Sequence, residues 1–283
     1  MPSLALVLNT HKRRADIKRS LLYVRSMDFM FNEIHVVNDG VSHDYKEYVK
    51  ILFNNVSNGA EHYFLHNTNG KGGVGARLHA VNQIKSDIVS FWDDDDILTP
   101  EYFNNVILHF SRFPQSMLLT SNYVRLYNLG SKVIMKGEVE AKEILGENKI
   151  GGFSFITLPI KSASILSQVP INLKAGQDWF LYYLIYRKYG LKNIHRSLTA
   201  DVYYNDKMSK YRITGGDNIN SLKSLATIVT LMNNNGENYS SERLKLLRYR
   251  MMQQANTRIL FNRKISLNTK LTYLKHCVKR LLS

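Results

Sequence analysis

Short apolar runs typical of β-strands alternate with helical patterns over residues 4 to 92. The apolar runs are LALVL, EIHVV, HYFLH and DIVSFW, at residues 4–8, 33–37, 62–66 and 87–92. Between them, Ile17, Leu21 and Val24 share one helical face, and the spacing predicts a second helix over residues 74–85. Strands and helices that alternate in this way form a mostly parallel sheet with helices on its faces. The sequence therefore predicts an α/β fold.

Polar side chains follow three of these strands. They lie at residues 9–13 after the first strand, at Asn38 and Asp39 after the second, and at residues 93–96 after the fourth. Parallel α/β sheets bind their ligands at the carboxyl ends of the strands. We therefore expect the three loops to converge on one crevice.

The fourth strand runs directly into four consecutive aspartates, in the segment FWDDDD at residues 91–96. Carboxylates this close repel one another, and they are costly to bury unless a cation offsets their charge. Magnesium and manganese prefer oxygen ligands, often one or two carboxylates together with substrate phosphates. The run stands between a buried strand and a helix start, with Thr99 as cap and Pro100 as first helical residue. This position favours a metal and diphosphate site over a solvated acidic loop.

The composition of the 283 residues, 44% hydrophobic and 11% aromatic, allows one large domain or one domain with an appendage. The single cysteine, Cys277, excludes an intramolecular disulfide and a cysteine zinc site. The opening segment MPSLALVLNTHKRR resembles neither a signal peptide nor a membrane span. These features predict a cytoplasmic protein.

The net charge of +15 is concentrated at one end of the chain. Residues 241–283 contain eleven lysines and arginines against one acid, Glu242. Leu244, Leu247 and Met251 recur at helical spacing between the bases. Such a segment can lie on an anionic membrane surface, or it can form ordinary amphipathic helices that pack on the body of the protein. Both interpretations stay open.

Several segments of the chain resemble the family-2 glycosyltransferases, which have the GT-A fold, in order and spacing. They are LVLNTHKR, EIHVVNDGVSHD, NTNGKGGVGARLHAV, IVSFWDDDDILTPEYF and GQDWFLYYL, and the resemblance covers roughly residues 3 to 190. It implies a Rossmann-like sheet and an inverting, metal-dependent transfer of a sugar from a nucleotide diphosphate donor, usually a UDP-sugar.

The resemblance also implies roles for the aspartate run. The family's Asp-x-Asp motif binds Mn²⁺ or Mg²⁺ together with the donor diphosphate, which assigns the metal to Asp95. Asp93 and Asp94 are then the partners that reach the ribose and phosphate, and Asp93 also belongs to the expected metal ligands. The division of roles within residues 93–96 stays open, since the run can be shifted by one residue.

Further positions match the family's nucleotide site. Asp39 of VVNDG corresponds to the carboxylate that contacts the base, although the acid that often precedes it is Asn38 here. Thr10, His11 and Arg13 match the loop around base and ribose.

The glycine-rich segment GKGGVG, at residues 70–75, invites a phosphate-loop ATPase interpretation. That motif needs Lys and then Ser or Thr after its last glycine, where this chain has Ala76 and Arg77. The resemblance instead implies that Arg77 and Lys71 lie near the nucleotide. A solvated loop lysine is the alternative for Lys71.

The segment AGQDWFLYYLIYRKYG includes the catalytic candidate, Asp178. In the resembling family, a carboxylate at this helix start is the general base that deprotonates the acceptor hydroxyl. Gln177 replaces the common glutamate. The alternative is that Asp178 merely caps a helix over residues 179–189.

The second half of the chain is less informative. Residues 116–137 suggest two strands joined at a glycine turn, and residues 151–160 are a candidate part of the acceptor pocket. Where family members often carry a metal-binding histidine, this chain has Asp206, a third candidate metal ligand or part of a lid.

These observations predict a GT-A catalytic domain at residues 1–215, with nucleotide-sugar and acceptor halves at 1–112 and 113–215. A basic helical region is expected at 216–283, with peripheral attachment to the cytoplasmic membrane face through residues 241–283. The expected acceptor is a hydroxyl of a glycan or lipid-linked sugar, as in cell-surface polysaccharide synthesis. A sugar-phosphate nucleotidyltransferase and a nucleic-acid-binding protein are the alternatives, although the acidic crevice argues against nucleic acid.

Overall fold

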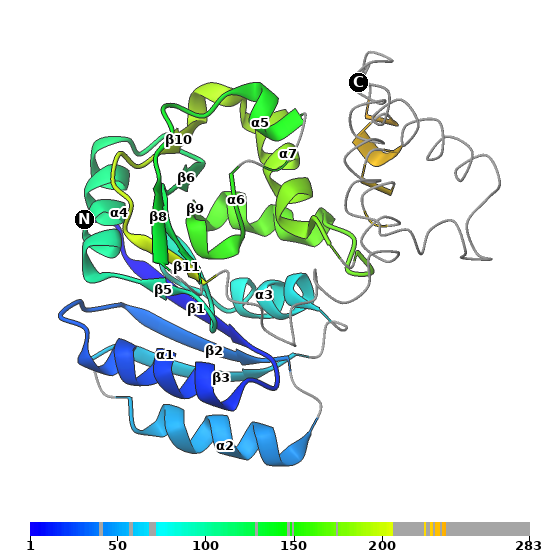
Figure 1. Cartoon of the computed structure of the whole chain (residues 1–283). Helices are drawn as coiled ribbons and strands as arrows, with labels where there is room; N and C mark the ends of the chain where they lie inside the picture. Colours follow the sequence, from blue (N-terminus) through cyan, green and yellow to red (C-terminus); the bar gives the residue numbers. More distant parts are fainter. Residues whose placement is uncertain are drawn as a thin grey trace, which may run out of the picture. The chain divides into compact units, whose positions relative to one another are not determined.

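The structure is a computed structural model of the whole chain (Figure 1). It describes residues 1–39, 42–56, 59–67, 72–127, 130–145, 148, 150–173 and 175–205, with a few positions between 224 and 235. The chain divides into two compact units, residues 1–172 with 177–207, and residues 173–176 with 208–283. The first unit contains both sheets and is described below. Most of the predicted basic region lies outside the described residues.

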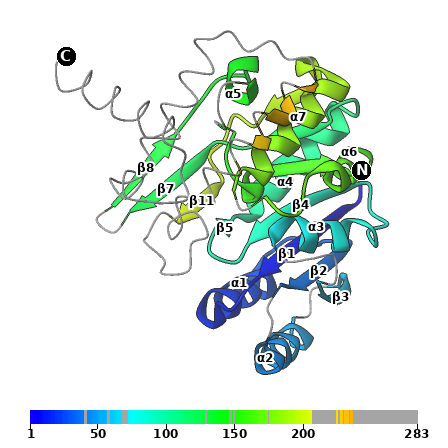
Figure 2. The same ribbon diagram turned by 90° about the vertical axis from the view of Figure 1, so that its right-hand side faces the viewer.

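A seven-stranded sheet forms the centre of the first unit (Figures 1 and 2). Its strands are β1 (Leu4–Thr10), β2 (Glu33–Asn38), β3 (Glu61–His66), β4 (Ile88–Asp93), β6 (Leu118–Thr120), β9 (Ile156–Pro159) and β10 (Ile194–Arg196), in the order β10-β6-β9-β4-β1-β2-β3. The four strands predicted from the first part of the sequence are β1 to β4, and they pair in parallel. The predicted mostly parallel α/β fold is confirmed.

Strand β9 interrupts the parallel pattern. It runs antiparallel between β4 and β6, so Ser90 of β4 lies beside Thr157 of β9. Their hydroxyls form a buried hydrogen bond of 2.5 Å, which Tyr102 extends with a contact of 3.0 Å to Thr157. The segment predicted as part of an acceptor pocket thus forms, from Ile156 onward, an inner strand of the sheet.

Helices cover both faces of the sheet. They are α1 (Arg14–Ser26), α2 (His43–Asn54), α3 (Gly73–Val81), α4 (Pro100–Arg112), α5 (Ala141–Leu145), α6 (Ile160–Ala163) and α7 (Gln177–Tyr189), with short 3₁₀ turns at Phe153–Phe155, Ser164–Gln168 and Leu191–Asn193. In Figure 1, α1 and α2 lie on one side of β1 to β3 and α3 lies on the other. The predicted face of α1 is buried, since Ile17, Leu21 and Val24 are at most 2% exposed.

The start of α4 was predicted correctly from the sequence, whereas the end of α3 was not. Helix α4 begins as predicted, with Pro100 in its first turn and the Thr99 hydroxyl accepting the Tyr102 amide N–H at 3.3 Å. Helix α3 ends at Val81, four residues before the predicted end. The amides of Lys85 and Ser86 donate to the Glu33 carboxylate, so they are not available to a helix.

A smaller four-stranded sheet lies beside the large one, in the order β5-β11-β7-β8. Its strands are β5 (Ile97–Leu98), β7 (Tyr123–Tyr127), β8 (Gly130–Ile134) and β11 (Val202–Asn205). The predicted pair of strands with a glycine turn corresponds to β7 and β8, which are antiparallel. Residues 118–120, expected in the same pair, form β6 of the large sheet instead.

Candidate active site

The carboxyl ends of β1, β2 and β4 meet at one edge of the large sheet, here named the carboxyl edge. The strand register sets Asn9 beside Asp93 and Thr10 beside Asn38. The loop after β1 also contacts the loop after β2, because the Asp39 amide donates to the Thr10 carbonyl at 2.9 Å. The predicted convergence of three loops on this edge is present.

The four aspartates divide into two pairs. Asp94 and Asp96, the inner pair, are 2% and 4% exposed. Asp93 and Asp95, the outer pair, keep 35% and 16% of their side chains exposed. A tight turn causes the alternation, because the Asp96 amide donates to the Asp93 carbonyl at 3.0 Å. Only the outer pair is therefore well placed to meet a ligand.

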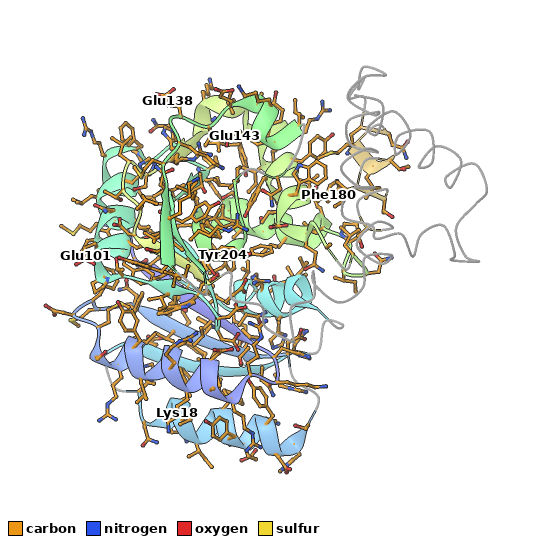
Figure 3. The ribbon with its side chains drawn as sticks, viewed as in Figure 1. Lys18, Glu101, Glu138, Glu143, Phe180 and Tyr204 are labelled. Carbon is orange, nitrogen blue, oxygen red and sulfur yellow. The ribbon has the colours of Figure 1, made fainter. Side chains whose placement is uncertain are left out.

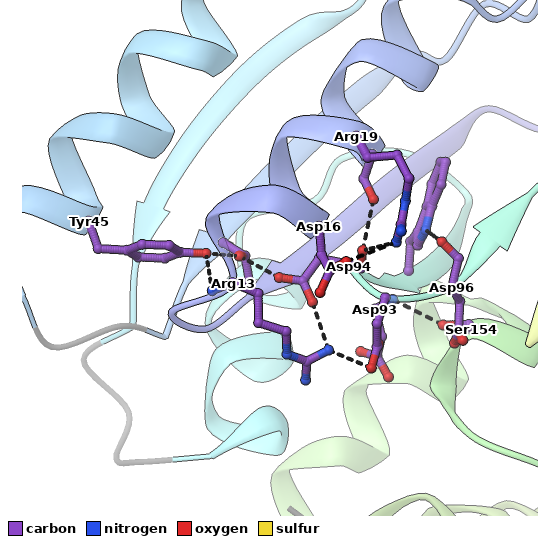
Figure 4. A network of polar contacts seen from close by, with 12 residues as sticks. Arg13, Asp16, Arg19, Tyr45, Asp93, Asp94, Asp96 and Ser154 are labelled. Carbon is purple, nitrogen blue, oxygen red and sulfur yellow. Dashed lines mark hydrogen bonds and ion pairs between the residues drawn. The ribbon is translucent and has the colours of Figure 1, made fainter. Parts of the chain in front are cut away.

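Asp94 joins β4 to the first loop and the first helix (Figure 4). Its carboxylate accepts the Thr10 hydroxyl at 2.6 Å and lies 3.1 Å from the Arg13 guanidinium. Its backbone carbonyl accepts from Arg19 and Ser20 of α1. Burial raises the pKa of Asp94 to about 7, although Arg13 and Thr10 act against the shift. Asp94 is thus held inside the protein as a structural centre of the site.

Two arginines offset the charge of the outer pair. Arg13 lies 2.5 Å from Asp95, and Arg77 forms an ion pair with Asp93. The Arg77 guanidinium also stacks on the Phe153 ring, 3.8 Å from its centroid, and Arg77 is only 4% exposed. A side chain at Gly73 would collide with this guanidinium, which explains the glycine. The repulsion expected from the aspartate run is therefore relieved partly by cations built into the fold.

Asp39 connects the loops that follow β1, β2 and β3. Its carboxylate accepts the Asn67 amide at 2.7 Å and the Gly72 backbone N–H at 3.2 Å. His11 Nδ1 lies 2.7 Å from the Asp39 carbonyl. Gly72 has a φ of +119°, a conformation that side chains disfavour. Asp39 thus orders the start of α3, in addition to any contact with a ligand.

Asp178 lies in the first turn of α7 and is partly accessible to solvent. One carboxylate oxygen accepts the Trp179 backbone N–H at 2.8 Å, and the other accepts the Asn148 amide at 2.9 Å. The protein packed around the carboxylate raises the pKa of Asp178 to about 6, while the Trp179 N–H and Arg77 act against the shift. Because α7 begins at Gln177, Asp178 lies one residue inside the helix that it was considered to cap.

Gln177 joins two parts of the edge. Its side-chain oxygen accepts the Val74 backbone N–H at 3.2 Å, which links the start of α7 to the start of α3. The sequence does not predict this role, nor those of Asn148 and Ser154. The Ser154 hydroxyl accepts the Asp93 backbone N–H at 3.0 Å. These residues come from loops without periodic patterns, so only their neighbours in space identify them. Lys71 and Asp206 lie outside the described residues.

The outer pair is compatible with a hard divalent cation. Asp93 and Asp95 offer carboxylate oxygens on a partly exposed edge, and one or two carboxylates with substrate phosphates are a common ligand set for Mg²⁺ or Mn²⁺. The described residues contain no group of three or more His, Cys, Asp or Glu side chains arranged to hold a metal on their own. A cation here would therefore depend on the substrate for the rest of its ligands.

Comparison with protein families decides the identity. The model of the family described as Glycosyl transferase family 2 matches residues 6–163, more than half of the chain. The chain belongs to glycosyl transferase family 2. It is a glycosyltransferase, the activity that was predicted ahead of the nucleotidyltransferase and nucleic-acid-binding alternatives. No protein with a curated description matches the sequence.

Solved structures of glycosyltransferases share the fold. S. aureus TarS residues 1–349 in complex with UDP-GlcNAc superposes with a TM-score of 0.65 at 16% identity, over 96% of this chain and 79% of TarS. The mannosyltransferase PcManGT from Pyrobaculum calidifontis, in complex with GDP-Man and Mn²⁺, superposes with a TM-score of 0.63 at 14% identity, over 98% and 75%. Together with the family match, they confirm the predicted GT-A fold of this glycosyltransferase. Within the described part of the chain, every helix is too short or too polar to span a bilayer.

Proposed function

We propose that this glycosyltransferase moves a sugar from a UDP-sugar to a hydroxyl of a glycan or lipid-linked acceptor, with inversion at C1 and Asp178 as general base. The observation that supports this most is the state of Asp178. The residue is partly accessible, two hydrogen bonds hold its carboxylate, and burial of that group raises its pKa to about 6. A base with a pKa slightly below neutral is ionised at pH 7 and still basic enough to accept a proton.

The donor is assigned to the carboxyl edge. Thr10, His11 and Arg13 border the loop next to Asp39, and Arg77 lies beside Asp93. Two buried polar atoms on this edge, Asn9 Oδ1 and Arg77 Nε, have no hydrogen-bond partner among the described residues. Unpaired buried polar groups are costly, so their presence supports a polar ligand here. Lys71 is proposed to approach the same ligand.

The metal is assigned to Asp93 and Asp95, with Asp206 as a proposed third ligand. A bound Mn²⁺ or Mg²⁺ would neutralise the charge that develops on the leaving diphosphate. Arg13 and Arg77, each already paired with one outer aspartate, orient these carboxylates. Asp94 is proposed to hold the turn from inside, because its oxygens already face Thr10 and Arg13.

The proposed reaction is a single displacement. Asp178 takes the proton of the acceptor hydroxyl as that oxygen bonds to C1 of the donor sugar. The bond between C1 and the diphosphate oxygen breaks at the same time, and the nucleoside diphosphate leaves with both electrons of that bond. The protein ends with a proton on Asp178, which it returns to solvent.

The donor is tested by thermal shift of the full chain with UDP, GDP, CDP and ATP, each with Mn²⁺ or with EDTA. We expect stabilisation by UDP that requires Mn²⁺ and is lost in Asp93→Ala and Asp95→Ala. Stabilisation by another nucleotide would replace the donor assignment, and no shift with any nucleotide would contradict it.

The base is tested with Asp178→Asn, which preserves size but cannot accept the proton. We expect the variant to bind the donor normally and to lose about 10² to 10⁴ in kcat. Release of nucleoside diphosphate from the donor, with candidate sugars as acceptors, measures the turnover. Turnover near that of the wild type would exclude Asp178 as the base.

The basic segment at residues 241–283 is proposed to attach the enzyme to an anionic membrane surface, on the cytoplasmic face where lipid-linked acceptors are made. Its eleven basic residues against one acid support this. Co-sedimentation with vesicles containing phosphatidylglycerol tests it. Changing Arg243, Lys245 and Arg248 to glutamate should reduce the bound fraction at low salt, and unchanged binding would contradict the proposal.

A further inference from the structure

Asn148 lies in the loop between α5 and the 3₁₀ turn at Phe153–Phe155, and its amide is held at both ends. Its Nδ2 donates to Asp178 Oδ2 at 2.9 Å and to the Gly151 carbonyl at 3.0 Å. Its Oδ1 accepts the Gly151 backbone N–H at 3.2 Å. Only an oxygen can accept that N–H, so the orientation of the amide is determined. The NH₂ group must therefore face Asp178.

Hydrogen bonds connect Gly151 and Gly152, which follow Asn148 in the chain, to α7, the helix that contains Asp178. The Tyr182 hydroxyl, one turn further along α7, lies 3.1 Å from the carbonyls of both Gly151 and Gly152. Gly151 has a φ of +124°, and the Phe155 ring occupies the space that a side chain there would need. Asn148 and Asp178 therefore belong to one closely connected unit.

The two donors to Asp178 approach different oxygens. The Trp179 N–H binds Oδ1 and the Asn148 amide binds Oδ2, so rotation of the carboxylate would break one of the bonds. A carboxylate oxygen has a second lone pair after one such bond, which leaves it able to accept a further proton. The arrangement thus restrains the carboxylate without using up its basicity.

We propose that Asn148 is a positioning residue for the general base: its amide holds Asp178 in one orientation and favours the ionised carboxylate. This inference rests on the proposed function, because it assigns a role to Asn148 only if Asp178 is the base. Nothing in the family match singles out this asparagine, and its place is evident only from the contacts across the loop.

Other charged and titratable groups also act on Asp178. Arg77 of α3 favours its ionised form, and Asp93 of β4 opposes it. Tyr182 is buried and its own pKa is raised far above the ordinary value, so it stays neutral throughout the range in which Asp178 titrates. The Asn148 amide contributes a direct hydrogen bond to the ionised form, and removing it should raise the pKa of Asp178.

The direct test is the titration of Asp178 in the full chain labelled with [4-¹³C]aspartate, followed by NMR. The Asp178 signal is assigned by its loss in Asp178→Asn. In Asn148→Ala we expect the pKa to rise by about one unit, because a hydrogen bond to a charged group is lost. In Asn148→Asp we expect a larger rise, because the added carboxylate repels the ionised form while it can still accept the Gly151 N–H.

Asn105→Ala is the matched control. Asn105 is also partly buried, and its Nδ2 donates to Asp201 Oδ2 at 2.8 Å, on α4 and away from Asp178. This variant loses the same kind of hydrogen bond and should leave the Asp178 titration unchanged. An unchanged titration in Asn148→Asp, or in a folded Asn148→Ala, would overturn the proposal. Near-UV circular dichroism checks folding, and Asn148→Asp suffices if the alanine variant does not fold.

The kinetic test separates this inference from the proposed function. With the donor identified by thermal shift, the acid limb of kcat/KM against pH should lie at about 6 in the wild type. It should move up by about one unit in Asn148→Ala. Full activity of Asp178→Asn would defeat the proposed function and this inference together. An inactive Asp178→Asn with an unmoved limb in Asn148→Ala would defeat this inference alone.

Discussion

The pKa values of carboxylates shift in opposite directions at the two edges of the large sheet. At the amino edge, where the parallel strands β1, β2 and β4 begin, the pKa values of Glu33 and Asp87 are lowered. At the carboxyl edge, the pKa values of Asp94 and Asp178 are raised to about 7 and about 6. Burial raises the pKa of Asp94 and Asp178 most, whereas Asp87 is exposed and its hydrogen bonds outweigh the small effect of burial. At Glu33, which is buried, hydrogen-bond donors outweigh burial, so the partners as well as the burial make the two edges differ.

Neutral donors surround the carboxylates of the amino edge. Glu33 accepts the amides of Lys85 and Ser86, the Ser86 hydroxyl and a ring nitrogen of His35. Asp87 accepts the amide and hydroxyl of Ser3 at 2.8 Å. Hydrogen bonds from such donors favour the ionised form of the carboxylate. They also connect the starts of neighbouring strands to one another. This edge stabilises the fold.

At the carboxyl edge burial raises the pKa values most, and like charges add to its effect. Asp93 and Asp95 oppose the ionisation of Asp94, and Asp93 opposes that of Asp178. Carboxylates that are costly to ionise are common at functional sites, where a cationic ligand or a transferred proton can offset their charge. Carboxylates thus stabilise the fold at the amino edge, and at the carboxyl edge they are proposed to act on ligands.

The largest effect is expected at the amino edge, from Glu33→Ala. The substitution leaves the donors of Lys85, Ser86 and His35 without an acceptor, and it should lower the free energy of unfolding by about 3 kcal/mol at pH 7. The folded-state pKa of Glu33 is lowered, so its contribution is present above the unfolded-state pKa and is lost as pH falls through the folded value. Urea unfolding at pH 7 and pH 3.5 should therefore show a smaller deficit at the lower pH.

A second substitution, Gly73→Ala, tests the carboxyl edge alone. The new methyl group would displace the Arg77 guanidinium from Asp93, and the atom that it meets is the end of a flexible side chain and not backbone. We expect donor affinity to fall about tenfold, or about 1.4 kcal/mol, with little change in the melting temperature. Calorimetric titration with the nucleotide found by thermal shift measures the affinity. A large loss of stability would show that Arg77 supports the fold, as Glu33 does.

The third prediction, Asp94→Asn, should have the opposite sign from Glu33→Ala. The folded-state pKa of Asp94 is raised to about 7, so ionisation of the wild-type residue costs stability once the pH exceeds the unfolded-state value. The neutral amide avoids this cost, and we expect the melting temperature at pH 8 to rise by about 2 to 4 °C. The gain should shrink as the pH falls and should be lost near pH 3, where Asp94 is largely neutral in both states. A lower melting temperature at pH 8 would contradict the proposed difference between the two edges.

The smallest effect is expected from Glu61→Ala. Glu61 lies in register with Glu33 on the neighbouring strand, but it is exposed and its ion pair with Lys85 spans 3.5 Å in solvent. Exposed pairs of this kind contribute little to stability. The urea midpoint should equal that of the wild type within error, which makes this variant the matched control for Glu33→Ala. A deficit comparable to that of Glu33→Ala would show that position along the edge matters more than burial.

Much of the first half could be predicted from sequence because its signals are local. Apolar runs bounded by polar loops locate β1 to β4, and Thr99 with Pro100 locates the start of α4. The family resemblance, now confirmed by the family match, also rests on short contiguous segments. The individual roles proposed for Thr10, Asp39, Asp95 and Asp178 stay predictions.

The early end of α3 shows where local signals fail. The residues after Val81 continue a helical pattern, yet Glu33, about fifty residues earlier in the chain, takes the amides that the helix would need. Local signals also fail to predict the antiparallel strand β9 and the position of Asn148, since each depends on partners far away in sequence.

The sequence by itself therefore determined the α/β class, the convergence of loops at the strand ends, and the residue types available for a metal and a base. Only the tertiary structure decided which aspartates of the run face inward, which arginines offset the others, and which amide holds Asp178. The reason is physical: strand and helix patterns arise from neighbours in the chain, whereas burial, ion pairing and pKa values arise from neighbours in space.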